Sequence, residues 1–187
     1  MKLKSFLLLF AGLSVASQAQ DFSDMQWQNE LGYEFAIAYP TSSSATSNYM
    51  TMFNGIAYKP SYMMPIGDQM SLGLTLPLSI GASGDGGLVN VSYALAGQFS
   101  AGLGSTGLSV APVGAFMALG AGSFDVYPML YQGVESFRYY GAYMDFGFRI
   151  YYYGTPTTFS VGGWWNTNPE IGDYRMTVLR MTYALNY

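Results

Sequence analysis

The chain has 187 residues, and only 10% of them are charged, against roughly 25% in soluble domains. Seven basic residues, two of them Lys2 and Lys4 near the N-terminus, face eleven acidic ones, a balance that disfavours both a mixed charged surface and nucleic-acid binding. Histidine and cysteine are absent, which excludes Ser-His and Cys-His catalysis, histidine-ligated metals, disulfides and a lipoprotein anchor. We therefore expect no catalytic residue, no cofactor and no metal.

Residues 1–19 have the pattern of an export signal. Lys2 and Lys4 precede an apolar run from Phe6 to Val15, and small residues occupy the two cleavage-determining positions at Ser17 and Ala19. The run is about half of the roughly 20 residues that a spanning helix needs, so cleavage is favoured over a retained anchor. The predicted domains are a signal peptide, 1–19, and a β-barrel domain, 20–187.

Most of the remaining chain alternates between apolar and polar residues with the period of two that is typical of β-strands. The predicted strands are 26–39, 49–59, 69–80, 88–99, 107–119, 137–153, 157–166 and 174–187. The phase of the second and the fifth is left open. Residues 120–136 are interpreted as a loop because this keeps the strand number even, with an extra strand as the alternative. Pro60 is expected in a turn, 60–68, outside the ladder.

The last strand is apolar at alternate positions up to the final residue of the chain, at Leu179, Met181, Tyr183, Leu185 and Tyr187. This pattern resembles the closing strand of small bacterial outer-membrane barrels of the OmpA/OmpX type. The resemblance implies an all-β fold, a closed antiparallel eight-stranded transmembrane β-barrel, formed after removal of the signal peptide. It also implies an outer-membrane location, periplasmic termini, and insertion by the outer-membrane assembly machinery with the terminal strand as its recognition signal.

Charged residues gather on the predicted inward faces of three strands, at Glu30, Glu34, Asp145, Arg149 and Arg180. Strands one and eight become neighbours when the barrel closes, so Arg180 is expected to reach Glu30 or Glu34. An eight-stranded barrel is only wide enough for side chains, which favours a buried ion-pair network over a gated conduit or a catalytic carboxylate pair. The GxGxxG match at 102–107 lies between two strands, so we interpret it as a hairpin turn and not as a dinucleotide site.

These features predict a non-enzymatic outer-membrane protein with a structural, surface-interaction or complex-accessory role. The alternative is a narrow channel for small or apolar solutes, and a soluble ligand-binding barrel is the alternative at the level of the fold. The expected partners are outer-membrane lipid, the assembly machinery and other envelope proteins, and no nucleic acid.

Overall fold

The computed structural model describes residues 26–40, 51–84, 87–106, 111–130, 136–152, 155–166 and 174–186. The predicted signal peptide and Tyr187 lie outside these residues, and for the last strand the description is of the backbone. None of the described residues belongs to a helix long and apolar enough to cross a membrane. The described residues form β1 (Gln26–Pro40), β2 (Thr51–Pro65), β3 (Met70–Thr75), β4 (Leu78–Ser83), β5 (Leu88–Gly102), β6 (Val113–Pro128), β7 (Phe137–Tyr152), β8 (Thr155–Asn166) and β9 (Tyr174–Asn186).

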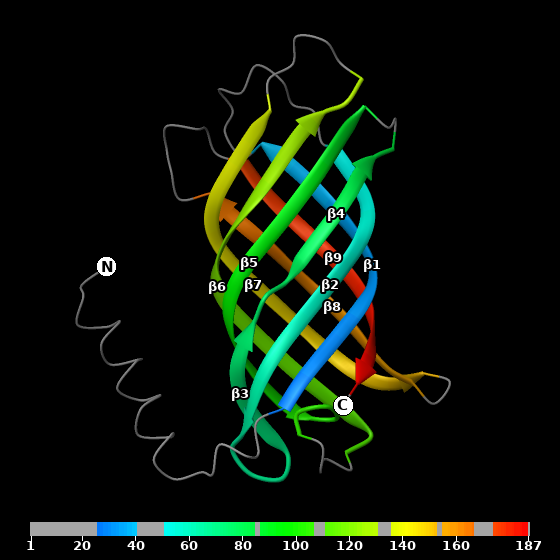
Figure 1. Ribbon diagram of the computed structural model, residues 1–187, viewed down its shortest axis with the longest axis vertical. Helices are drawn as coiled ribbons and strands as arrows, with labels where there is room; N and C mark the ends of the chain where they lie inside the picture. Colours follow the sequence, from blue (N-terminus) through cyan, green and yellow to red (C-terminus); the bar gives the residue numbers. More distant parts are fainter. Residues whose placement is uncertain are drawn as a thin grey trace, which may run out of the picture.

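The strands form one closed antiparallel sheet. β1 pairs with β2 on one side and with β9 on the other, and each remaining strand also has a neighbour on both sides. β3 and β4 occupy a single position in this ring, because each pairs with β2 and with β5. The ring therefore has eight positions, which confirms the predicted barrel, and the strands run obliquely around it (Figure 1).

The two ends of the barrel differ in the chain segments that they carry. β1 begins and β9 ends at the lower end in Figure 1, which we call the termini end. The opposite end, where β1 leads to β2, β4 to β5, β6 to β7 and β8 to β9, we call the loop end.

One wall of the barrel contains two prolines, and one of them interrupts a strand. The predicted third strand is broken at Leu76 and Pro77, because proline has no N–H to donate to the ladder. The neighbouring strands still bond to this segment: the Leu76 N–H donates to the Pro60 carbonyl at 2.9 Å, and the Ala94 N–H donates to the Pro77 carbonyl at 3.0 Å. The prediction that Pro60 lies in a turn is wrong, since β2 runs through it to Pro65 and it stands opposite Asn29 of β1.

The interpretation of residues 120–136 as a loop is also wrong for its first half. Gly120–Pro128 continues β6, whose ladder with β7 extends from Val113 to Val126. Glycine and alanine at 120–122 hid the alternation from the sequence. The even strand number is kept because the segment lengthens a predicted strand and adds no new one.

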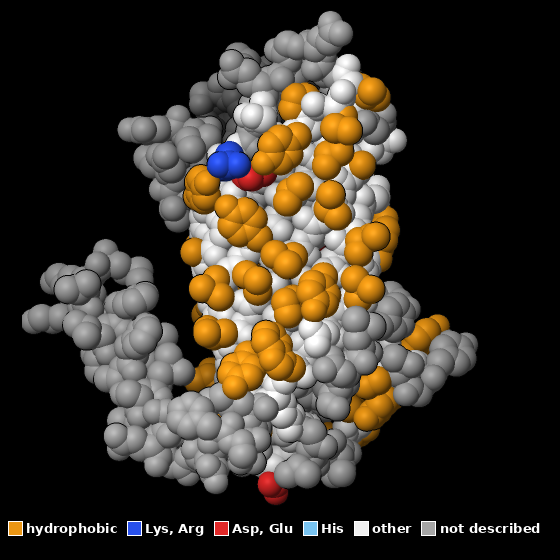
Figure 2. Space-filling view, in the orientation of Figure 1, with side chains coloured by type: hydrophobic (Ala, Val, Ile, Leu, Met, Phe, Trp, Pro, Cys, Tyr) orange, Lys and Arg blue, Asp and Glu red, His pale blue; other side chains and the backbone are white. Residues whose placement is uncertain are grey.

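The outward faces are apolar. Leu74, Leu95 and Ile56 are 56%, 60% and 59% exposed, and the predicted outward faces of 26–39, 69–80 and 88–99 are confirmed. The open phases are now assigned, with Met52 and Ile56 outward on β2 and Met117 and Leu119 outward on β6. Apolar side chains are distributed over the whole wall seen in Figure 2. A water-soluble barrel would have the opposite distribution, so these faces are suited to contact with lipid.

Candidate functional site: the barrel lumen

Arg149 of β7 forms the centre of the polar half of the lumen, toward the termini end. Its side chain is fully buried, and both Nη2 and Nε donate to Oε1 of Glu30 on β1, at 2.8 and 3.1 Å. β7 and β1 are not neighbours in the ring, so this ion pair crosses the lumen. Burying both charges is tolerated because each has an opposite charge within hydrogen-bond distance.

The turn after β5 packs against this ion pair. The Gly104 carbonyl accepts one hydrogen bond from Arg149 Nη1 at 3.1 Å and another from Gln28 Nε2 at 2.8 Å. Gly102 and Gly104 have φ angles of 75° and 67°, a left-handed conformation that glycine adopts without steric cost. Leu103 and Ser105 are buried. The described part of the GxGxxG match is thus a tight turn that covers the lumen at the termini end.

A second ion pair lies farther along the lumen. Lys59 Nζ of β2 is 3.8 Å from Asp145 Oδ2 of β7, and Tyr143 donates to the same oxygen at 3.1 Å. The Lys59 ammonium also lies 3.5 Å from the ring centroid of Phe116. The Arg149 guanidinium is 5.0 Å from the same centroid. The cations of both ion pairs therefore lie against the same aromatic side chain.

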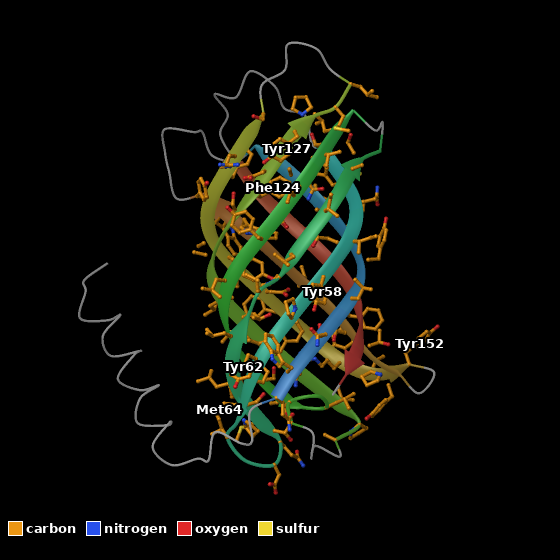
Figure 3. All side chains as sticks on the ribbon, viewed as in Figure 1. Tyr58, Tyr62, Met64, Phe124, Tyr127 and Tyr152 are labelled. Atoms are coloured by element: carbon orange, nitrogen blue, oxygen red, sulfur yellow. The ribbon has the colours of Figure 1, made fainter. Side chains whose placement is uncertain are left out.

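Aromatic rings gather in the half of the lumen toward the loop end. Phe124 of β6 lies 5.8 Å from Phe53 and 6.2 Å from Trp164, measured between ring centroids, and Trp164 lies 4.9 Å from Tyr143. These four side chains come from four different strands and are all buried. Figure 3 labels Phe124 in the part of the barrel near the loop end. The aromatic cluster thus lies toward the loop end, and the two ion pairs lie toward the termini end.

The structure brings together four of the five charged residues that the sequence places in the lumen. Glu30, Glu34, Asp145 and Arg149 are all buried. Glu30 binds Arg149, and Glu34 accepts a hydrogen bond from Ser79 at 2.7 Å. Arg180 is the register partner of Glu34 across the β1–β9 ladder, and its side chain lies outside the description. The functional role of this set stays a prediction.

Sequence reasoning did not include Lys59 in the lumen set. Met52, Ile56 and Tyr58 face outward on β2, and Lys59 has the opposite parity. Its position was missed because the predicted strand ended there. Among the described residues no group of three or more acidic side chains lies close enough together to hold a metal ion.

The sequence matches no protein-family model and no curated protein. Solved structures do resemble it. Ail, the attachment invasion locus protein of Yersinia pestis, in complex with the heparin analogue sucrose octasulfate, has a TM-score of 0.55 at 10% identity over 87% of this chain and 99% of that chain. A second structure of Ail gives the same TM-score and identity over 85% and 97%. The outer membrane protein OprG from Pseudomonas aeruginosa has a TM-score of 0.47 at 8% identity over 86% and 96%. With its closed ring of eight positions, apolar wall and polar interior, the chain has the fold of the small eight-stranded outer-membrane β-barrels.

Proposed function

We propose that this protein is a sealed, non-enzymatic barrel of the outer membrane that serves in surface contact or as an accessory subunit of a membrane assembly. The observation that carries the proposal is the set of large buried side chains that meet across the lumen. Four aromatic rings occupy the half toward the loop end, and two cross-lumen ion pairs occupy the other half. Side chains that occupy the lumen in this way hold the strands together and disfavour transport through the barrel. The connections between the strands remain available for contact with a partner.

The connections at the loop end favour particular partners. They comprise residues 41–50, 84–87, 129–136 and 167–173. In sequence they contain Asp85, Glu135, Glu170 and Asp173 but no lysine or arginine, and the first of them is rich in serine and threonine. Ail binds a heparin analogue, but acidic connections repel polyanions. The partner that we propose for this end is therefore a neutral or basic surface, and not a sulfated one.

Fractionation and conductance together test the proposal. We expect the full chain, expressed in a Gram-negative host, to appear in the outer-membrane fraction and to change its gel mobility on heating, as a closed barrel does when it unfolds. We expect no steady current when the folded protein is added to a planar lipid bilayer. A stable open-channel current would favour the narrow channel instead, and recovery in the soluble periplasmic fraction would reject the membrane assignment.

The end of β9 carries a second proposal, that Leu179, Met181, Tyr183, Leu185 and Tyr187 form the signal for assembly. β9 is the strand that closes the ring on β1, and Tyr187 follows its last described residue. We expect deletion of Tyr187 to slow assembly several-fold while the finished barrel keeps its urea midpoint. Pulse-labelled cells, with the heat-dependent mobility shift as readout, measure the rate. Unchanged kinetics would remove the signal role.

A further inference from the structure

An ion pair lies on the outer wall of the barrel, within an otherwise apolar surface. Asp125 of β6 and Arg138 of β7 are register partners, and Arg138 Nε is 3.1 Å from Asp125 Oδ2. The Arg138 side chain is 56% exposed, whereas that of Asp125 is 5% exposed. Figure 2 shows basic and acidic atoms side by side among apolar ones in the upper part of the wall. The pair therefore presents its positive end outward.

Neighbouring hydroxyl groups hold this pair in place. Ser123 donates to Asp125 Oδ1 at 2.5 Å, and Tyr127 donates to Oδ2 at 3.2 Å. Arg138 Nη2 lies 3.5 Å from the Tyr127 hydroxyl. The carboxylate is thus covered by three donors, and the guanidinium is fixed through Nε and Nη2. Tyr140 is a further side-chain hydrogen-bond partner of Arg138, and more than half of the arginine side chain is still exposed on the wall of the barrel.

A hollow of about 500 Å³ begins at Tyr140, two residues along β7 from Arg138, and lies toward the middle of the wall. Its sides are Tyr93 of β5 and Tyr140 of β7, and its floor is built of glycine and alanine from β6 and β7. The hollow exists because two outward residues that face each other in the ladder, Ala121 and Ala142, have only methyl side chains. Leu95 and Trp165 stand on either side of this pair.

The ion pair and the hollow suit the two parts of an amphiphilic molecule, its charged head group and its hydrocarbon chain. Arg138, Tyr140 and Ala142 follow one another on the outward face of β7, and four residues of a strand span about 13 Å. An exposed guanidinium donates charge-assisted hydrogen bonds to a phosphate, and an apolar hollow accepts a hydrocarbon chain. An exposed guanidinium is tolerated on a barrel wall only near the membrane surface, which is the depth of lipid head groups.

We propose that this surface binds a phosphorylated glycolipid of the outer leaflet, with its phosphate on Arg138 and one acyl chain in the hollow between Tyr93 and Tyr140. Charge complementarity selects an anionic head group, because the exposed end of the pair is the guanidinium and the carboxylate is covered. The inference rests on the outer-membrane location proposed above, with the loop end outward.

Native mass spectrometry of the folded full chain in detergent, with added lipid A as the probe, tests this inference. We expect the wild type to retain lipid A, and Arg138→Gln and Ala142→Phe each to lower the retained fraction by about tenfold, which corresponds to the loss of one strong contact. Ala115→Phe is the matched control for Ala142→Phe, because Ala115 is also an outward alanine but lies on β6 near the termini end. It should leave retention unchanged.

The source of the phosphate and the folding of each variant are controlled separately. The wild-type protein is also tested with dephosphorylated lipid A, which removes the phosphate without changing the protein. This lipid should bind the wild type as weakly as lipid A binds Arg138→Gln. The inference would be overturned if Arg138→Gln retained as much lipid A as the wild type does. It would also be overturned if the wild type retained dephosphorylated lipid A or phosphatidylglycerol as well as it retains lipid A. The heat-dependent mobility shift establishes that each variant is folded. Loss of lipid A binding from a barrel that still fractionates with the outer membrane would leave the proposed function standing.

Discussion

Replacing Arg149 with methionine is expected to lower the free energy of unfolding by about 3 to 5 kcal/mol, the range for breaking a buried ion pair from one side. The change removes both donors from Oε1 of Glu30 and one of the two donors from the Gly104 carbonyl. Glu30 is 2% exposed, so water does not replace what it loses. Urea unfolding of the barrel in lipid vesicles, followed by tryptophan fluorescence, measures the change.

The matched control is the double variant Arg149→Met with Glu30→Met. Because it removes both charges and refills the volume, it should recover most of the loss. A cost below about 1 kcal/mol for Arg149→Met alone would be typical of an exposed pair. That result would mean that water reaches the lumen at this level, and it would reopen the channel alternative.

Replacing Leu119 with arginine is expected to cost about 2 to 4 kcal/mol, the range for a charge on the lipid face near the bilayer midplane. Leu119 is 47% exposed and lies near the middle of β6, between Gly97 of β5 and Met144 of β7. The unfolding free energy in vesicles gives the magnitude, and the amount of heat-modifiable protein in the outer membrane gives the effect in cells.

Met70→Arg is the control for depth. Met70 is 45% exposed, close to the value for Leu119, but it is the first residue of β3 at the termini end. The same charge there should cost only about 0 to 1 kcal/mol, because it reaches the membrane surface. Equal costs at the two positions would contradict the placement of the bilayer around the barrel.

The fold was predictable because lipid selects large apolar side chains on one face of every strand and so imposes a clear period of two. Leu74, Leu76 and Ile80 show this pattern most plainly, and all are outward. The pattern fails where the outward residue is small. At Ala121 the methyl group carries no signal, so the second half of β6 was taken for a loop. Pro60 was wrongly predicted to lie in a turn for a different reason: a proline carbonyl still accepts a hydrogen bond within a ladder.

The candidate site was predictable only in part. Parity along a strand decides which residues face the lumen, and it identified Glu30, Glu34, Asp145 and Arg149. Parity cannot decide which of them meet, because that depends on the tilt and stagger of the closed sheet. Arg180 was expected opposite the two glutamates, and its backbone is the register partner of Glu34. The partner of Glu30 comes instead from β7, three ring positions away, which no sequence spacing indicates.

The distance along the chain between the lumen partners affects the order of folding. Glu30 and Arg149 are separated by 119 positions and stand on strands that do not touch. In a partly wrapped sheet these opposite charges are held apart, and they meet only when the sheet curls round so that its two ends can join. Contacts of such long range form late and slowly. Neutralisation of the interior and completion of the ring are therefore a single cooperative event, and a half-wrapped intermediate gains little stability from its own charges.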